Sequence, residues 1–312
     1  ENLEAKQSLY EDLQTKMKPG AILATNTSSI RLEDLRTVLN NPDRFIGIHF
    51  FNPVAQLPLV EIIRCADTQQ AVLDSAFEFV KGIGKFPLEC ASSPGFVVNR
   101  ILGPYMAEAM HLAEAGVPLT TIDAAAEDFG MPMGPLRLID EVGADVALHV
   151  ARTLAEGLGG RLEIPRILEQ LVEDGDLGAK TGSGFYRYEK GKQAVPRHDI
   201  QPEITSEGRS CVRVCSIADR LALTMVNEAA MCLEESVVKD VSDVDFAMIT
   251  GTGFAPFRGG PLQYADTVGV RTVVETLGRL AAEGGVRFAP CKRLIEMAKR
   301  GDQFYGESNV AI

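Results

Sequence analysis

The sequence predicts an α/β sheet domain followed by two related, all-α domains. Near its amino terminus, short apolar runs alternate with amphipathic segments, which is typical of a sheet covered by helices. From Ser93 onward, long helical patterns are interrupted by Gly-Pro turns. A single pattern of residues occurs twice within this helical region. We therefore expect an α/β domain over residues 1–92 and helical domains over residues 93–209 and 210–312.

The first domain is expected to open with a helix. Leu9, Leu13 and Met17 recur at roughly helical spacing until a Pro-Gly pair stops the pattern. The apolar run AILAT at residues 21–25 then fits a buried strand. The polar stretch NTSS at residues 26–29 suits a turn, and its hydroxyl groups equally suit capping of a helix that follows.

Two further strands are predicted at residues 45–51 and 57–63. An amphipathic helix over residues 68–84 follows, and the chain returns to the sheet at residues 85–90. The predicted sheet domain thus starts with a helix, whereas a parallel βα unit ordinarily starts with its strand. We therefore expect the domain to begin before Glu1.

The helical region repeats itself. Arg100 is followed eight residues later by Glu108, and Arg220 is followed at the same interval by Glu228. Each copy then carries Gly-Pro-Leu, an aspartate and Val-Gly, at Gly134, Pro135, Leu136, Asp140, Val142 and Gly143, and at Gly260, Pro261, Leu262, Asp266, Val268 and Gly269. The shared order indicates a duplicated helical module. Residues 181–210, which are rich in Gly, Pro and charge, are the predicted connector.

Composition excludes several classes of protein. The 312 residues are 46% hydrophobic and 24% charged, as in a globular protein. The balance of 31 basic against 43 acidic residues gives a net charge of −12, so nucleic-acid binding is not expected. No apolar run is long enough to cross a membrane, and the charged amino terminus does not resemble a signal peptide, which predicts a soluble, intracellular protein. The six cysteines lack metal-site spacing, so we expect reduced thiols and no metal.

One histidine and one glutamate interrupt the apolar strands. His49 and Glu61 are the only acid–base side chains between Arg44 and Arg64, and burying them is costly unless they pair. A carboxylate bonded to one ring nitrogen fixes the tautomer and stabilises the imidazolium that forms when the other nitrogen takes a proton. The pair therefore indicates a general base, and a purely structural histidine is the alternative.

The strand period places His49 on the same face as Gly47, and we expect this small residue to leave room for the imidazole. Ile46, Ile48 and Phe50 are predicted on the opposite face. His49 should then face one side of the sheet and the aliphatic side chains the other.

Other polar residues also occupy positions that suit a ligand. Asn52 follows one predicted strand and Ser28 another, and ligands of open α/β sheets bind at the carboxyl ends of strands. Asn99 lies among apolar residues of a predicted helix, so its amide needs either a backbone or a ligand partner. Lys180, among glycines, could reach a phosphate or a carboxylate, or be an exposed lysine without a specific partner. No GxGxxG motif follows a strand, so these residues alone do not predict a nucleotide enzyme.

The chain contains, in order, the segments ENLEAKQSLYEDL, ATNTSSI, IGIHFFNPV, LVEII, SPGFVVNRIL, MPMGPLRLIDEVG and AKTGSGFYRY. Together they resemble the 3-hydroxyacyl-CoA dehydrogenase family. This resemblance implies a Rossmann-type NAD-binding domain and oxidation of L-3-hydroxyacyl-CoA, an acyl-CoA thioester, to 3-ketoacyl-CoA with NAD in fatty-acid β-oxidation. The second helical copy resembles the dehydrogenase region of multifunctional β-oxidation enzymes, such as the alpha subunit of the fatty-oxidation complex.

The resemblance also implies roles for single residues. His49 would be the base that takes the hydroxyl proton, and Glu61 would orient it. Ser28 would contact the substrate near the reacting centre, and Asn99 would hold the developing 3-keto group or the thioester. The residues that would line the NAD site are Glu1, Lys6, Asn52 and Lys180.

One departure from the family concerns the NAD site. The family's glycine-rich loop and acidic ribose ligand come before the first residue of this chain. We therefore expect an incomplete Rossmann-type domain, in a fragment of a larger enzyme, that binds NAD weakly or not at all on its own. The family further implies a cytoplasmic or organelle-matrix protein, a thiolase-like partner subunit and helical domains that mediate oligomerisation.

Two alternatives remain open at this point. The chain would be a non-catalytic helical assembly module if the duplicated region served only to bind another subunit. It would be another β-hydroxyacid dehydrogenase if its base were a lysine, as is general in those families. The motif HFFNP favours histidine as the base.

Overall fold

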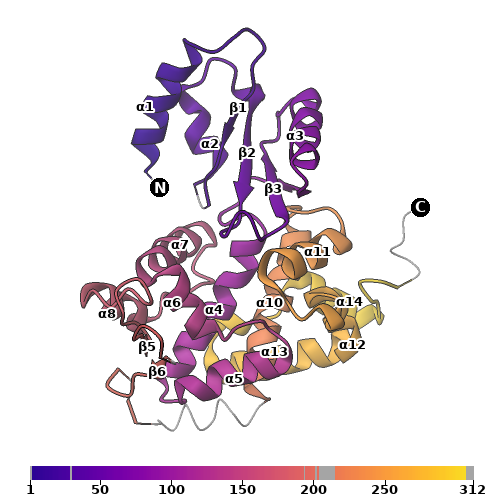
Figure 1. The fold of residues 1–312 in the computed structure, drawn as a ribbon. Coiled ribbons are helices and arrows are strands. Elements are labelled where there is room, and N and C mark those ends of the chain that lie inside the picture. The colour runs from indigo at the N-terminus through magenta and orange to yellow at the C-terminus, as the bar shows by residue number, and fades with distance from the viewer. Residues whose placement is uncertain (1, 29, 193, 201, 204–214, 307–312) are drawn as a thin grey trace.

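The computed structural model describes residues 2–28, 30–192, 194–200, 202–203 and 215–306. A sheet domain stands at one end of the molecule and a larger helical region at the other (Figure 1). Within the described residues, no helix is both long and apolar enough to cross a membrane.

The sheet has four strands, in the order β1 (Leu23–Thr25), β2 (Phe45–Phe50), β3 (Leu59–Arg64) and β4 (Phe86–Ala91). β1 and β2 are parallel, so their carboxyl ends lie at the same edge of the sheet. β3 is antiparallel to β2, and β4 is parallel to β3. The antiparallel pair places His49 directly opposite Glu61.

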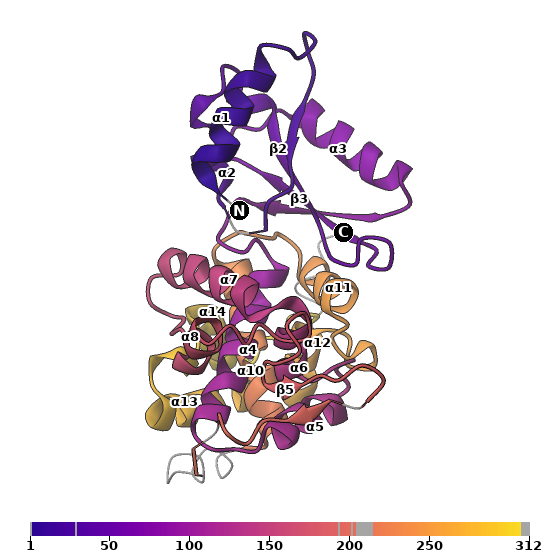
Figure 2. The same cartoon turned by 60° about the vertical axis from the view of Figure 1, so that its left-hand side comes forward.

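Helices cover both faces of this sheet. α3 (Gln70–Gly82) lies on one face, where Ile46 and Ile48 pack against its apolar side. α1 (Leu3–Gln14) and α2 (Leu32–Leu35) lie on the other side, as Figures 1 and 2 show. Short 3-10 turns, η1 (Arg36–Val38) and η2 (Pro42–Arg44), lead from α2 into β2. The predicted alternation of faces along β2 is therefore confirmed.

Gly47 makes room for two core side chains. A Cβ atom at this position would lie 2.9 Å from Cβ of Ile63 and 3.3 Å from Cδ1 of Leu32.

The helical region contains two series of elements. The first is α4 (Val98–Glu114), α5 (Leu119–Phe129), α6 (Pro135–Val142), α7 (Ala144–Gly157), α8 (Arg166–Glu173) and the hairpin of β5 (Tyr186–Arg187) and β6 (Val195–Pro196). The second is α10 (Ile217–Glu234), α11 (Val241–Thr252), η3 (Pro256–Arg258), α12 (Pro261–Val268), α13 (Val270–Gly284), η4 (Val286–Phe288) and α14 (Lys292–Arg300). Both views place α4 and α10 side by side in the middle of this region (Figures 1 and 2).

The repeated arginines and glutamates join the two copies crosswise. Nε of Arg100 in α4 lies 2.7 Å from Oε1 of Glu228 in α10. Arg220 in α10 pairs in the same way with Glu108 in α4. All four side chains are buried. Each copy therefore contributes one arginine and one glutamate to the two ion pairs, as expected for two modules related by an approximate two-fold axis.

In the first copy, two buried aspartates hold the turns around α6. Asp123 accepts hydrogen bonds from Leu136 N–H, at 2.9 Å, and from the Tyr186 hydroxyl, at 2.7 Å. Asp140 accepts from the N–H groups of Phe185 and Tyr186, both at 2.9 Å. The aspartates thus tie the segment after α8 to the helices.

The second copy repeats this arrangement. Asp245 accepts from Leu262 N–H and from the Tyr305 hydroxyl, both at 2.8 Å. Asp266 accepts from the N–H groups of Phe304 and Tyr305, both at 2.9 Å. A Phe-Tyr pair that follows the helices therefore closes each copy.

The connector predicted over residues 181–210 begins too early. Phe185 and Tyr186 are fully buried and belong to the first helical copy. The glycine and charge content of the segment did not indicate that it is buried, because its backbone N–H groups donate hydrogen bonds to a buried aspartate. The predicted boundary at residues 209–210 lies outside the described residues.

Candidate active site

His49 and Glu61 form a buried pair between β2 and β3. Nδ1 of His49 lies 2.7 Å from Oε2 of Glu61. His49 is 5% exposed and Glu61 is fully buried. A carboxylate can only accept a hydrogen bond, so Nδ1 is the donor and the proton-free nitrogen is Nε2. Among the described residues, Nε2 has no hydrogen-bond partner.

The second oxygen of Glu61 is held by the start of a helix. Oε1 accepts hydrogen bonds from Val97 N–H, at 3.1 Å, and from Val98 N–H, at 3.0 Å. These N–H groups belong to the amino terminus of α4, where the backbone carries partial positive charge. The carboxylate is therefore fixed by three donors, and it orients the imidazole in turn.

A tight turn aims these two N–H groups at Glu61. Gly95 and Phe96 have φ angles of 70° and 53°, in the left-handed region. A Cβ atom on Gly95 would lie 3.0 Å from the backbone nitrogen of Arg100, so only glycine fits there. A positive φ is unusual for phenylalanine, and such backbone strain concentrates at functional sites.

Two aromatic rings fix the imidazole. The ring of Phe51 lies 4.6 Å from that of His49, and the ring of Phe96 lies at 5.7 Å, both approximately edge to face. Both phenylalanines are buried. They keep water from the His49–Glu61 hydrogen bond and leave the imidazole little freedom to rotate.

The predicted polar residues gather at the carboxyl ends of β1 and β2. Oδ1 of Asn26 accepts from Phe50 N–H at 3.4 Å, and Nζ of Lys6 donates to the Asn26 carbonyl at 3.2 Å. Nδ2 of Asn99 donates to the carbonyl of Ser28 at 3.3 Å. The structure thus brings Ser28 and Asn99 together, and the partner of this asparagine amide is a backbone group.

In the described part of the polar stretch, residues 26–28, the structure shows no side-chain cap for α2. Oγ1 of Thr27 accepts from Ile30 N–H at 3.2 Å. The first N–H of α2, that of Leu32, donates to Oγ of Ser92 at 3.0 Å. Ser29 itself lies outside the described residues.

The predicted cofactor residues come from several elements. Lys6 and Asn52 are at the edge formed by β1 and β2, and the exposed side chain of Asn52 has no hydrogen bond among the described residues. Lys180 pairs with Asp145 at the start of α7, and this hydrogen bond lowers the pKa of the Asp145 carboxyl. Glu1 lies outside the described residues.

The edge of the sheet suits the nicotinamide end of NAD. Polar side chains follow two parallel strands there, and Nε2 of His49 lacks a partner among the described residues. The described residues therefore fit this cofactor in their chemistry. They contain no cluster of three or more His, Cys, Asp or Glu side chains that could hold a metal ion.

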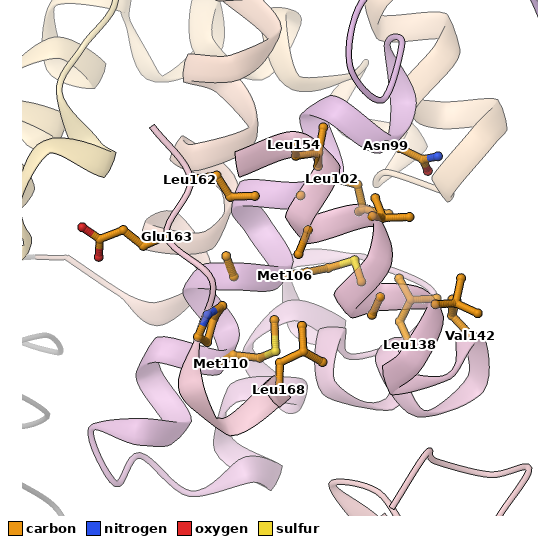
Figure 3. A pocket seen from close by; sticks show the side chains of 17 residues that line it. Asn99, Leu102, Met106, Met110, Leu138, Val142, Leu154, Leu162, Glu163 and Leu168 are labelled. Carbon is orange, nitrogen blue, oxygen red and sulfur yellow. The ribbon is translucent and has the colours of Figure 1, made fainter. Parts of the chain in front are cut away.

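An apolar pocket of about 110 Å³ starts beside Asn99. α4, α6, α7 and α8 line it, with Leu102, Met106 and Met110 along α4 (Figure 3). Sequence analysis missed this pocket. Its only signal was apolar residues at helical spacing, which a helix packed in a core shows equally well.

Comparison with known proteins identifies the family. The family model described as "3-hydroxyacyl-CoA dehydrogenase, NAD binding domain" matches residues 1–93. The model of the C-terminal domain of the same family matches residues 95–188 and 217–306. The chain belongs to the 3-hydroxyacyl-CoA dehydrogenase family. Its sheet domain is accordingly of the NAD-binding, Rossmann-like type, and the expected fold class is confirmed.

Individual relatives agree with this. The chain is 38% identical over 305 residues to the fatty acid oxidation complex subunit alpha of Vibrio cholerae, and the match covers 98% of this chain and 43% of that protein. The chain thus spans less than half the length of this curated relative.

Two solved structures are similar over most of the chain. The 3-hydroxybutyryl-CoA dehydrogenase of Escherichia coli is 26% identical with a TM-score of 0.84, and the match covers 96% of this chain and 80% of that one. The dehydrogenase part of multifunctional enzyme 1 from C. elegans is 27% identical with a TM-score of 0.62, and coverage is 95% and 69%.

Proposed function

We propose that this chain carries the general base and the substrate-holding residues for the NAD-dependent oxidation of L-3-hydroxyacyl-CoA to 3-ketoacyl-CoA. The observation that carries the proposal is the buried His49–Glu61 pair, whose free nitrogen lies near the edge of an NAD-binding-type sheet. Family membership supports the substrate class.

In this mechanism His49 takes the proton of the C3 hydroxyl on Nε2. The imidazolium that forms is stabilised by Glu61, which holds Nδ1–H at 2.7 Å. NAD, when bound, supplies the acceptor for the hydride that leaves C3. Because Glu61 is also fixed by two backbone N–H groups, the base is already oriented before substrate arrives.

Ser28 and Asn99 are proposed to hold the oxygen on C3 as it becomes a ketone. Their hydrogen bond keeps the two residues at one place above the end of β1. A hydroxyl and an amide can donate to an oxygen that gains partial negative charge, and fixed donors of this kind favour the transition state.

For the cofactor, we propose contacts from Lys6 and Asn52, which lie at the appropriate edge of the sheet. Lys180 and Glu1 are proposed only from their places in the family motifs. The division into domains at residues 92 and 209 belongs to the same proposal.

The wider setting is also proposed. A thiolase-like partner subunit is supported by the relative from Vibrio cholerae, which is named as a subunit of a complex. Oligomerisation through the helical domains and a cytoplasmic location complete the proposal. Copurification of a second subunit from cells that express the protein would test the association.

The proposed base is tested by His49→Gln. In the whole protein that carries this chain, we expect NADH formation from 3-hydroxybutyryl-CoA to fall about 10²–10⁴-fold, because glutamine cannot take the proton. Thermal unfolding should stay close to that of the wild type, since the glutamine amide can still donate to Glu61. His149→Gln, on the exposed side of α7, is the matched control. Activity of His49→Gln close to the wild-type value, in the whole protein that carries this chain, would refute the proposal.

A further inference from the structure

The pocket beside Asn99 is almost entirely apolar. Of the described side chains that line it, Asn99 and Glu163 alone are polar, and Figure 3 shows them at opposite ends. The labelled leucine and methionine side chains lie between these ends. Val142 and Val146, which are exposed, lie at its border with solvent. Such a lining suits a hydrocarbon and offers nothing that would bind a charged group within it.

The pocket adjoins the candidate active site at Asn99. Asn99 lines it and also donates to Ser28. The residue before it, Val98, donates its N–H to Glu61. From Asn99 to Met110 the pocket follows α4 for eleven residues, which at 1.5 Å per residue is about 16 Å. A chain attached to a group bound at the His49–Glu61 pair can therefore enter the pocket at Asn99.

The second helical copy provides an internal comparison for α4. Arg100 and Glu108 correspond to Arg220 and Glu228 without insertion, which fixes the counterpart of each α4 residue in α10. Gly103 lines the pocket and is half-buried, whereas its counterpart Leu223 is buried. A Cβ atom on Gly103 would already lie 2.6 Å from the Leu154 side chain across the pocket.

The same difference appears on the facing helix. Gly143 and Gly269 precede α7 and α13 at equivalent positions, so Ala147 corresponds to Val273 and Ala151 to Leu277. Ala147 and Ala151 line the pocket, whereas Val273 and Leu277 are both fully buried.

Three small residues of the first copy thus line the pocket where the second copy has branched side chains. Three other pocket residues of α4 change in the opposite sense, since Leu102, Met106 and Met110 are larger than Ala222, Val226 and Ala230. All three counterparts are buried, whereas Leu102 and Met106 are not. Methionine is flexible and adapts to what packs against it. The residues of the second copy at these positions are therefore buried, whereas those of the first copy line a pocket with an adaptable wall.

We propose that this pocket receives the hydrocarbon chain of the acyl thioester, and that Gly103, Ala147 and Ala151 determine the chain length that it accepts. The inference rests on the proposed function and extends it to the substrate's acyl group. It assigns to the protein a preference for medium or long chains over the four-carbon substrate, because a short chain would leave most of the pocket unused. Each methylene that the pocket buries should raise affinity about fourfold.

Ala151→Leu tests the pocket, because it introduces the residue of the second copy. Binding of butanoyl-, octanoyl- and dodecanoyl-CoA to the whole protein is measured by calorimetry without NAD. For the wild type we expect affinity to rise with chain length until the pocket is filled. For Ala151→Leu we expect unchanged butanoyl-CoA binding and at least about a tenfold loss for dodecanoyl-CoA, equivalent to some two methylenes.

Ala155→Leu is the matched control. It makes the same change one turn further along α7, at a half-buried position outside the pocket, and should leave the chain-length profile unchanged. Ala147→Val makes a smaller change inside the pocket and decides the matter if Ala151→Leu does not fold. Wild-type affinity that is independent of chain length, or a pocket variant with the wild-type profile, would overturn the proposal.

Binding without NAD separates this inference from the proposed function. If His49→Gln retained activity while Ala151→Leu lost long-chain binding, the assigned base would be wrong and the pocket assignment would stand. If His49→Gln were inactive and the pocket variants kept the wild-type profile, the base would stand and the pocket assignment would fall.

Discussion

At the scale of single residues, the role of Glu61 depends on which of its oxygens meets which donor. One oxygen is used by His49, and the other by the N–H groups of Val97 and Val98. A glutamine amide at this position has one oxygen, so it cannot accept hydrogen bonds from His49 and from the helix N–H groups through two separate oxygens. Its carbonyl can serve the helix, but its NH₂ group then faces Nδ1 of the imidazole.

Glu61→Gln should therefore invert the tautomer of His49. With Nδ1 forced to accept a hydrogen bond, Nε2 carries the proton and can no longer act as a base. We expect turnover of 3-hydroxybutyryl-CoA to fall about 10²–10⁴-fold, with thermal unfolding changed much less. Glu89→Gln, which alters a carboxylate bonded to Arg64 on the neighbouring strand, is the control. Turnover of Glu61→Gln within about threefold of the wild type would contradict this use of the pair.

The pairing of His49 with Glu61 could be predicted from the sequence, because two adjacent apolar strands each carried one ionisable residue and neither could be buried alone. The donors on the other side of Glu61 could not be predicted. They depend on a positive φ at Phe96, and nothing in the identity of a phenylalanine indicates that conformation. The Pro94-Gly95 pair was the visible sign of the turn.

At the scale of elements, buried aspartates define how each helical copy closes. The sequence repeat included Asp140 and Asp266, but their partners lie some 40 residues away. The partners of Asp140 were assigned to the connector, and no element was predicted for those of Asp266. A carboxylate that accepts hydrogen bonds from backbone N–H groups places no requirement on the side chains of the donating segment. That segment therefore shows no sequence pattern that would reveal the contact. The helical character and the duplication of this region were therefore predictable, and the closing Phe-Tyr segments were not.

The carboxyl of Asp245 is expected to make the stability of the second helical copy depend on pH. Burial raises the pKa of its carboxyl from 3.8 to about 6, in spite of hydrogen bonds from Leu262, Gln263 and Tyr305. The folded protein therefore holds a proton that the unfolded chain releases between about pH 4 and 6. The contribution of this group to stability is present below pH 4 and is lost as the pH rises through 6.

Asp245→Asn removes this titration. We expect the stability of the wild type relative to the variant to decrease by up to about 3 kcal/mol between pH 4 and pH 7, measured by urea unfolding at both values. The comparison with the variant cancels the other carboxylates. Asp128→Asn, on the exposed side of α5, should show no such trend relative to the wild type. If the stability of the wild type relative to the variant stayed constant or increased with pH, the prediction that burial raises the pKa of Asp245 would be contradicted.

At the scale of the whole molecule, the duplication explains why the modules pack crosswise. An arginine and a glutamate eight residues apart on one helix are separated by about 12 Å, so they cannot pair with each other. Two copies that face each other with opposite directions can satisfy both residues at once. The sequence predicted the two modules, but the crossed pairing needed the spatial relation of α4 to α10, which no local pattern specifies.

This interface can be tested with a double-mutant cycle on Arg100 and Glu228, which are both buried. Arg100→Met leaves the Glu228 charge buried without its partner and should lower the free energy of unfolding by about 3–5 kcal/mol. Glu228→Met should cost less, because Arg100 keeps its contact with Glu235 at 2.8 Å. The double variant should be more stable than the sum of the single effects predicts, since two apolar side chains can pack where two charges were removed.

Guanidinium-induced unfolding of the four proteins measures this coupling. The exposed pair of Arg300 and Asp302 is the control, and Arg300→Met should change stability by less than about 0.5 kcal/mol. Additive effects of the Arg100 and Glu228 substitutions would contradict a direct pair between the copies. A large coupling would establish that the second helical module holds α4, and with it the N–H groups that orient Glu61, in the position that the His49–Glu61 pair requires.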